Sequence, residues 1–383
     1  MASIIYKNEV IKRRFFGYVR NSKGFSEKTI ECYENAIWLW EDFSHKTDYI
    51  GFNKTAAEGF KGWLKTKKKA NSQREISVSY CYDMLRYLRV FFGWLSKQKG
   101  YKKIDQTAID YLNLSKAEVK IATQPRNIEV PSLEDIKAVI EGIQGDSVGL
   151  QGSSEVEQRD RALISLIFLT GARISAVRTL PMKSFDRDKL TIDQNPAFGV
   201  KTKFSKRIIT PLIPYLYKES LDYFLEWFDY LEDKKKFKPD DPLFPATKIE
   251  NGVENLSYYN TGQVEPTFWE SSSSPRKIIE KRFKEAGIKH YKPHSIRHSL
   301  IKRLSKLSLT EEQKKAISQS LGHEDVRTTF GSYGYGKIDE EKQIEIIKNI
   351  DFEGKNQGAK QSMSQEDIER LAKELAKKLK TDS

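Results

Sequence analysis

Four of the five histidines of the chain lie within a stretch of 34 residues: His290, His294, His298 and His323. Such a cluster indicates a functional site, and zinc is one candidate ligand, because His294 and His298 stand at i and i+4 of a predicted helix. Neither an HExxH glutamate nor a cysteine ligand accompanies the pair. The sequence therefore predicts a site without metal.

His294 also stands three residues before Arg297, so the two side chains share one face of the predicted helix. An arginine fixed beside an imidazole outlines a phosphate site, because the planar guanidinium donates to two phosphate oxygens at once. A second arginine, Arg173 in LTGARISAV, lies among apolar residues, where an unpaired cation is costly. Its partner is either an anionic ligand or an internal carboxylate, for which Asp160 and Asp186 are the candidates.

A tyrosine completes this set of reactive residues. In LTEEQKKAISQSLGHEDVRTTFGSYGYG, Thr310 and Gln313 form a predicted capping box, and Gly322 is placed to end the helix. His323 is thus presented at a helix terminus. Tyr333 follows ten residues later among three glycines, which favour a mobile or tightly turned segment. With an ordinary pKa of about 10, a tyrosine attacks only with the help of a base and an electrophilic phosphate.

Helices and one hairpin must position these residues. SLEDIKAVIEGI is predicted to be a capped helix, and RDRALISLIFLTGARISAVRTL to form two buried helical pieces separated at Gly171. Strands are predicted for KLTID and RIITPL, with residues 199–205 as the hairpin between them. Residues 145–154 are expected to be a loop. Residues 245–275 are polar and lack a period, so they are interpreted as a long surface insertion.

The first 120 residues are predicted to form short helices. SEKTIECYENAIWLWEDF and VSYCYDMLRYLRVFFGWL both have apolar residues at helical spacing, and their aromatic stripes are interpreted as core and not as a platform for stacked bases. A basic loop is expected between helices at Lys65, Lys67, Lys68 and Lys69. Residues 115–131 lose the period and gain proline, which is typical of an exposed linker.

The charge balance indicates a polyanionic partner. Lys and Arg total 66 against 53 Asp and Glu, a formal net charge of +13, and residues 1–130 alone hold 24 basic and 14 acidic residues. Most of the electrostatic attraction is therefore expected from the N-terminal third. Cys32 and Cys81 lie in predicted helices, so neither a disulfide framework nor a thiolate metal site is expected. Without an apolar run of about 18 residues or a signal-peptide pattern, we expect a soluble cytoplasmic protein.

Three segments, TGARIS, HSIRH and LGHEDVRTTFGSY, together resemble the boxes of the tyrosine recombinase or phage integrase family in order and spacing, with a lysine hairpin between the first two. The resemblance covers residues 25–350. It implies a mainly α fold with a small antiparallel β-sheet. The implied parts are a helical core-binding domain that binds DNA (1–120), a linker (121–130), an α+β tyrosine-recombinase catalytic domain (131–350) and a C-terminal tail with a terminal helix (351–383).

The resemblance also implies which residues bind the phosphate. Arg173 is similar to the first arginine of the family's phosphate clamp. His294 and Arg297 are similar to the family's paired histidine and arginine, and His323 to its last histidine. By this resemblance His294 is the general base, and His323 donates a hydrogen bond to the same phosphate.

The nucleophile and the general acid are implied in the same way. Tyr333 is similar to the family's nucleophile, with Tyr335 as the alternative. The hairpin lysine is Lys201, which resembles the family's Lys-Thr pairing, or Lys203, which matches better when counted back from the proline of the second strand. The first of these two is slightly favoured. Ala176 departs from the family, because many relatives have an acidic residue there.

The function implied is that of a site-specific DNA recombinase or integrase that cleaves and rejoins strands through a 3′-phosphotyrosyl intermediate, to integrate or excise a mobile element. No cofactor is needed, because one phosphodiester is exchanged for another. The expected partners are double-stranded DNA of the nucleoid and further copies of the chain, as a tetramer in the synaptic complex. The narrow apolar stripe of residues 364–380 fits packing on a neighbouring subunit. Two alternatives stay open: a type IB topoisomerase, and a DNA-binding regulator that has lost catalysis.

Overall fold

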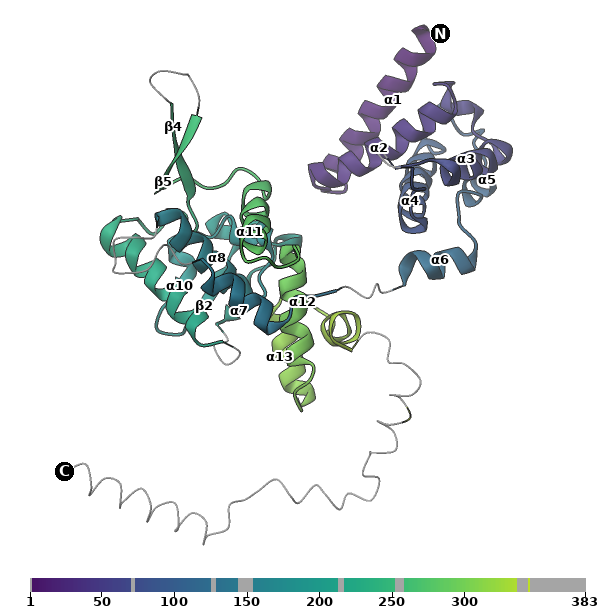
Figure 1. Cartoon of the computed structure of the whole chain (residues 1–383). Helices are drawn as coiled ribbons and strands as arrows, with labels where there is room; N and C mark the ends of the chain where they lie inside the picture. The colour runs from purple at the N-terminus through teal and green to yellow at the C-terminus, as the bar shows by residue number, and fades with distance from the viewer. Residues whose placement is uncertain are drawn as a thin grey trace, which may run out of the picture. The chain divides into compact units, whose positions relative to one another are not determined.

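The chain forms two compact units, Met1–Arg126 and Asn127–Ser383 (Figure 1). The computed structural model describes residues 2–69, 73–124, 129–143, 154–212, 217–251, 258–335 and 344. Two predictions lie outside these described residues: the loop at residues 145–153 and the terminal helix at residues 364–380. Ser154, the last residue of the predicted loop, is described. No helix in the described ranges is both long and apolar enough to cross a membrane.

The first unit is helical, as predicted. Its helices are α1 (Ala2–Asn21), α2 (Glu27–Phe43), the 3-10 helix η1 (Tyr49–Gly51), α3 (Lys54–Thr66), α4 (Val78–Leu95), α5 (Gln106–Asp110) and α6 (Lys116–Thr123). The starts of α2 and α4 are set by Ser26 and Ser77, whose side-chain oxygens accept hydrogen bonds from the backbone N–H groups of Thr29 and Tyr80. The two helices predicted here are confirmed, and they pack against each other.

Aromatic side chains make up much of the core of this unit. Trp40 of α2 lies edge-on to Phe92 of α4, with ring centroids 5.0 Å apart, and Phe92 stacks on Phe52 at 3.9 Å. All three side chains are buried. The interpretation of the aromatic stripes as core is therefore confirmed, although Trp38 of α2 is 54% exposed.

The segment after residue 115 is more ordered than the sequence predicted. Ser115 and Glu118 form a capping box at the start of α6, in which the serine hydroxyl accepts from the Glu118 N–H and the glutamate accepts from the Ser115 N–H. Glu118 also pairs with Lys65 at the end of α3. The prediction of an irregular linker from 115 to 131 was wrong for α6. The helix has no buried residue, so it lacks the apolar period that identifies helices in a sequence.

The second unit combines helices with short strands. Its α-helices are α7 (Leu133–Glu141), α8 (Glu155–Thr170), α9 (Ile174–Val177), α10 (Glu219–Asp229), α11 (Ser273–Glu285), α12 (Pro293–Leu304) and α13 (Glu311–Ser320). The 3-10 helices η2 (Met182–Ser184), η3 (Pro196–Phe198) and η4 (Lys203–Ser205) and the π-helices η6 (Tyr230–Lys234) and η7 (Arg327–Tyr335) join them. The strands are β1 (Phe185–Asp186), β2 (Thr191–Gln194), β3 (Ile208–Pro211), β4 (Ala246–Asn251) and β5 (Tyr258–Glu265).

Helix α8 is the centre of this unit. Every residue from Ala162 to Thr170 is buried, and α7, α10, α11 and α12 all pack against the helix. Figure 1 shows α8 among α7, α10 and α11. The helix ends at Gly171, whose φ of 60° is left-handed, and α9 follows three residues later. The predicted break between two buried helical pieces is confirmed.

Two antiparallel sheets complete the second unit. The first has the order β1-β2-β3, with Ile192 opposite Thr210, so the predicted hairpin between two strands is confirmed. The second pairs β4 with β5 and stands out from the helices of its unit (Figure 1). This pair corrects the prediction of an irregular insertion at 245–275. Val264 of this hairpin is buried but Ile249 is 61% exposed, so the segment lacks the continuous apolar pattern of a buried strand pair and resembles a polar loop in sequence. The fold class, mainly α with small antiparallel sheets, is confirmed.

Candidate active site

Arg297 of α12 lies where two other helices end. Its side chain is 2% exposed. Nη1 donates to the carbonyl of Gly171, which caps α8, and Nη2 donates to the carbonyl of Leu321, which caps α13, each at 2.6 Å. Carbonyl groups at helix C-termini carry partial negative charge, so they stabilise a buried cation. One arginine thus joins α8, α12 and α13.

Arg173 starts α9 directly after this junction, and it approaches the segment that follows α13. The backbone of Gly322 has a φ of 71°, and a Cβ added there would lie 2.3 Å from Cδ1 of Ile208 and 3.5 Å from Nη1 of Arg173. Only glycine fits this position. The half-buried guanidinium of Arg173 is therefore held next to the residue that precedes His323.

His323 is buried between Arg297 and η7. Its Nε2 lies 2.9 Å from Nη2 of Arg297, and its Nδ1 lies 2.8 Å from the Thr329 hydroxyl. Burial, followed by the positive charges of Arg297 and Arg173, lowers the pKa of His323 from 6.5 to about 3. The ring is therefore neutral at physiological pH, and it carries a single N–H.

His294 and His298 lie one turn apart on α12, with ring centroids 4.9 Å apart and ring planes at 88°. His294 is exposed and His298 is buried. For His298, burial followed by the charge of Arg297 lowers the pKa to about 4. The pKa of His294 is also lowered to about 4, by desolvation of the inner part of its ring, although the residue as a whole is exposed, and then by His298 and Arg297. Within the described parts of the chain, no group of three His, Cys, Asp or Glu residues could hold a metal ion.

The β2–β3 hairpin is fastened to the end of α13. The hydroxyl of Thr210 donates to the carbonyl of Ser320 at 2.7 Å, and Lys206 pairs with Glu324. Both contacts join the hairpin to the residues that flank His323. They hold the hairpin loop, which carries both candidate lysines, beside the arginines and histidines.

The two candidate lysines are in different situations. Both side chains are exposed, and the backbone N–H of Lys201 donates to the Thr179 hydroxyl at 2.9 Å. The charge of Lys203 is one of the causes that lower the pKa of His294 and of His323. The ammonium of Lys203 thus acts electrostatically on the histidines of the site.

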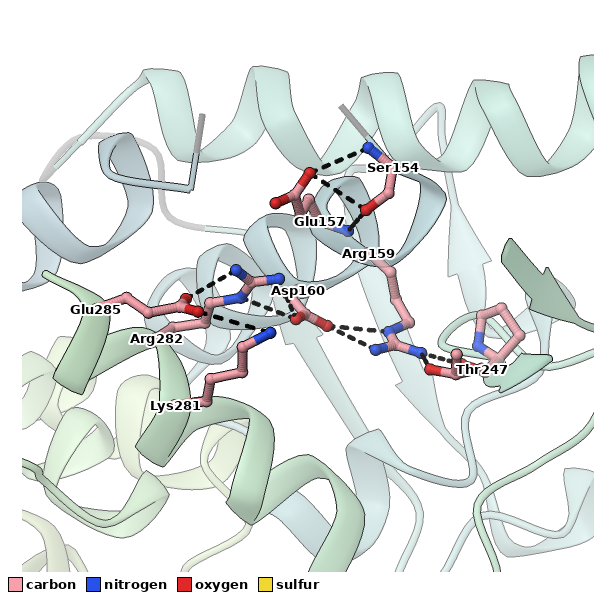
Figure 2. A network of polar contacts seen from close by, with 9 residues as sticks. Ser154, Glu157, Arg159, Asp160, Thr247, Lys281, Arg282 and Glu285 are labelled. Carbon is pink, nitrogen blue, oxygen red and sulfur yellow. Dashed lines mark hydrogen bonds and ion pairs between the residues drawn. The ribbon is translucent and has the colours of Figure 1, made fainter. Parts of the chain in front are cut away.

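Asp160 forms ion pairs with two arginines other than Arg173. Figure 2 shows its carboxylate between two other arginines: Oδ1 accepts from Nη2 of Arg159 and Oδ2 accepts from Nη2 of Arg282, both at 2.7 Å. Asp186 pairs with Lys189 at 2.9 Å. The two carboxylates that the sequence offered as internal partners of Arg173 are thus engaged elsewhere.

Tyr333 and Tyr335 both lie in η7, which packs against α12 and α13. The side chains of both tyrosines lie outside what the structure describes. The glycines around Tyr333 predicted a mobile or tightly turned segment, but the backbone through Tyr335 is helical, and it is anchored by the buried side chains of Thr329 and Phe330. Tyr333 is therefore carried by an element that contacts the helix of His294 and Arg297.

Ser318 and Thr329 are two residues near His323 that were not predicted from the sequence. Ser318 of α13 is 1% exposed and Thr329 of η7 is 0% exposed, and their hydroxyl oxygens lie 2.8 Å apart. Hydroxyls in a polar stretch read as surface or capping groups, and no spacing rule pairs residues eleven positions apart. Only the fold brings them together behind His323.

The buried histidines predict how stability depends on pH. His298 and His323 have pKa values of about 4 and about 3 in the folded chain, against 6.5 when unfolded, so the unfolded chain takes up protons first as the pH falls. Stability is therefore fully present above pH 6.5 and is lost towards pH 4. Between pH 7 and pH 5 we expect a loss of about 1–2 kcal/mol per buried histidine, measured by calorimetry of the full chain.

Two variants separate this effect from general acid unfolding. His298→Gln removes one buried group that titrates, so it should make the fall in melting temperature between pH 7 and pH 5 shallower. His45→Gln changes an exposed histidine of the first unit and should leave that slope as it is. An equal slope in the His298→Gln and wild-type chains would contradict the assignment.

The chain is similar to known proteins in sequence and in fold. Residues 149–335 match the sequence model of the phage integrase family. A tyrosine recombinase XerC from Thermodesulfovibrio yellowstonii is 26% identical over 319 residues, which cover 82% of this chain and 88% of the relative. A probable integrase/recombinase from Aquifex aeolicus is 24% identical over 332 residues, which cover 84% of this chain and 93% of the relative.

The fold is also similar to that of a solved structure, the Tn1549 transposon integrase in complex with transposon right end DNA. The TM-score is 0.55 at 15% sequence identity, and the superposition covers 89% of this chain and 99% of the integrase chain. At this identity the likeness concerns the fold.

Proposed function

Because the chain belongs to the phage integrase family and is a tyrosine-type site-specific recombinase, we propose that it cleaves and rejoins double-stranded DNA through a 3′-phosphotyrosyl intermediate on Tyr333. The observation that carries the proposal is the junction at Arg297, where the ends of α8 and α13 meet α12. His323 lies 2.9 Å from Arg297 there, Arg173 approaches Gly322, and both arginines contribute to the lowered pKa of His323 and of His294. This positive surrounding supports the binding of a phosphodiester anion.

The cleavage step exchanges one phosphodiester for another. The Oη of Tyr333 attacks phosphorus and loses its proton to His294, and the bond from phosphorus to the 5′ oxygen breaks. The departing oxygen takes a proton from the hairpin lysine, so that the products are a 3′ phosphotyrosyl bond and a free 5′ hydroxyl. Arg173 and Arg297 neutralise the non-bridging oxygens as charge develops on them. Rejoining is the reverse reaction with another 5′ hydroxyl.

The lowered pKa of His294 in the protein without DNA is compatible with its proposed role as general base. Positive charges at Arg297, Arg173 and Lys203 contribute to the lowering, after desolvation and the neighbouring His298. A bound phosphodiester places negative charge among these cations and offsets their effect, so the pKa of His294 rises when substrate is present. The histidine becomes a stronger base only in the complex, where the tyrosine needs one.

The biological role that we infer is integration or excision of a mobile element by a tetramer on two DNA sites. The similarity to a transposon integrase and to a probable integrase/recombinase supports this role. The basic surplus of residues 1–130 supports DNA binding by the first unit, because most of its basic residues are exposed, including several that form ion pairs at the surface.

The test uses DNA that flanks the gene. The purified full chain is mixed with nicked suicide duplexes from this region, and covalent adducts are counted after denaturation. We expect an adduct at one sequence and exchange of strands between two duplexes that carry it. A chain that relaxes supercoils without exchanging strands would favour the topoisomerase alternative, and a chain that binds without forming an adduct would favour the regulator.

The general acid is proposed to be Lys203. Its effect on the pKa values of His294 and His323 supports this choice over Lys201, which the Lys-Thr pairing in the sequence slightly favoured. Lys203→Ala should slow single-turnover cleavage about 100-fold or more, because proton donation to the leaving oxygen is lost. Lys201→Ala is the matched control, and its rate should stay within a few-fold of wild type.

A second substrate identifies the role of the lysine. Sulfur in place of the bridging 5′ oxygen leaves as a thiolate and needs no proton, so it should restore cleavage by Lys203→Ala. If instead Lys201→Ala is the slow variant and is the one rescued by sulfur, the assignment passes to Lys201.

A further inference from the structure

A chain of hydrogen bonds runs from Arg297 through His323 into buried hydroxyl groups. Arg297 Nη2 lies 2.9 Å from His323 Nε2, and Nδ1 of the same ring lies 2.8 Å from Oγ1 of Thr329. Oγ1 of Thr329 lies 2.8 Å from Oγ of Ser318, which donates to the carbonyl of Asp325 at 3.4 Å. Both hydroxyl groups are inside the protein, so each depends on its protein partners.

The chemistry of Arg297 sets the direction of this chain. A guanidinium only donates hydrogen bonds, so Nε2 of His323 accepts and the single proton of the neutral ring lies on Nδ1. That N–H donates to Thr329, and the hydroxyl of Thr329 then donates to Ser318. Each donor in the chain thus meets an acceptor in one tautomer of the ring.

The same two hydroxyls also accommodate the other tautomer. When Ser318 donates to Thr329 and Thr329 donates to Nδ1 of His323, the proton of the ring lies on Nε2 and can be donated to an anion in the site. The bond that Ser318 gives up, to Asp325, is the longest of the chain. Reversal leaves the ring in place only if Nη2 of Arg297 turns from Nε2 of His323 to the bound anion, because two N–H donors cannot face each other at 2.9 Å.

Thr329 also belongs to the element that carries the proposed nucleophile. It lies in η7, four residues before Tyr333, whereas Ser318 lies in α13. The hydroxyl pair consequently ties η7 to α13 at the position of His323. This contact therefore holds both the imidazole of His323 and the first turn of η7, the helix that contains Tyr333.

We infer that Thr329, held by Ser318, is a positioning residue that together with Arg297 keeps the proton of His323 on Nδ1 in the free protein, and that strand cleavage depends on this hydroxyl. The second part rests on the proposed function, in which Nε2 of His323 donates to the scissile phosphate. The first part concerns the protein alone.

Three variants of the full chain test the dependence of cleavage. Thr329→Val keeps the shape of the side chain and removes the hydroxyl, and we expect single-turnover cleavage of a nicked duplex to fall about 10- to 100-fold with unchanged DNA affinity. Thr329→Ser keeps the hydroxyl and should restore most of the rate. Thr328→Val is the matched control at the exposed neighbouring position, and it should behave as wild type.

The tautomer itself is read by nitrogen NMR of the full chain labelled with 15N-histidine. The chain has only five histidines, and the signals of His323 are those that vanish in His323→Phe. In the wild-type chain without DNA we expect the pattern of a neutral ring protonated at Nδ1. In Thr329→Val we expect that pattern to shift towards the Nε2 tautomer or a mixture, because Nδ1 has lost its acceptor.

Each outcome decides the inference. A wild-type rate or an unchanged 15N pattern in Thr329→Val would overturn it. So would a Thr329→Ser chain as slow as Thr329→Val, because the volume of the side chain would then matter and not its hydroxyl. If the wild-type chain forms no adduct at all, the proposed function fails, whereas the NMR measurement still tests the tautomer.

Discussion

Tyr333→Phe is expected to abolish the covalent adduct between protein and DNA while DNA binding persists. The substitution keeps the aromatic ring and removes only the oxygen proposed to attack phosphorus, so single-turnover adduct formation should fall by at least about 1000-fold. The adduct is measured on a nicked suicide duplex by denaturing gel, and binding by a native gel. The reaction of the wild-type chain should proceed in EDTA and without nucleotide triphosphate.

Tyr335→Phe is the matched control, because it makes the same change two residues later in η7. It should form the adduct at a rate close to wild type. If Tyr335→Phe loses the adduct and Tyr333→Phe keeps it, the nucleophile is Tyr335, and the reaction class stands. If both variants keep the adduct, the proposal of a phosphotyrosyl intermediate in η7 fails.

Arg173→Ala should reduce adduct formation by about 100- to 1000-fold, because one cation that stabilises the developing charge on phosphate is lost. The side chain is half-buried and starts the short helix α9 without capping it through a side-chain bond. The melting temperature of the variant is measured beside its rate, so that a loss of charge stabilisation is distinguished from a loss of fold. Arg207→Ala is the control, at an exposed arginine of the hairpin paired with Asp193 at 2.7 Å.

Arg297→Ala should lose the adduct to a similar extent but for two reasons. Besides the charge, it removes the donor to the carbonyls of Gly171 and Leu321, and each buried carbonyl left without a partner costs about 1–3 kcal/mol. The two variants are thus distinguished by stability. An Arg173→Ala chain that reacts as fast as wild type would contradict the clamp, and an Arg297→Ala chain with wild-type stability would contradict the structural role.

The parts of the fold that the sequence predicted are those with a strong local pattern. The buried helix α8 and the helix that carries His294 and Arg297 follow from apolar spacing, and the glycine that ends α13 follows from its position. The β2–β3 hairpin follows from two apolar strands around a turn. These elements carry the residues proposed to react, so motifs that lie far apart in the sequence predicted one site.

The parts that the sequence did not predict depend on contacts between distant residues. The β4–β5 hairpin is fixed by a hydrogen bond from the Val264 N–H to Glu155 at 2.7 Å and by Arg159, which donates to Thr247 at 2.9 Å. No local pattern in a polar segment reveals such partners. In the site, the choice between the two lysines, and the role of Thr329, likewise depend on which side chains the fold brings near His323.

The position of Arg297 has a consequence for reading related genes. A guanidinium that closes two helix ends is needed by the folded protein whether or not any DNA is cut. A related protein that has lost catalysis and only binds DNA would still need this arginine for its fold. Selection would no longer conserve Tyr333 and Lys203, whose proposed roles are catalytic. Decay of activity in such lineages should therefore be sought in the tyrosine and the hairpin, and an intact arginine in the α12 motif is no proof of a working enzyme.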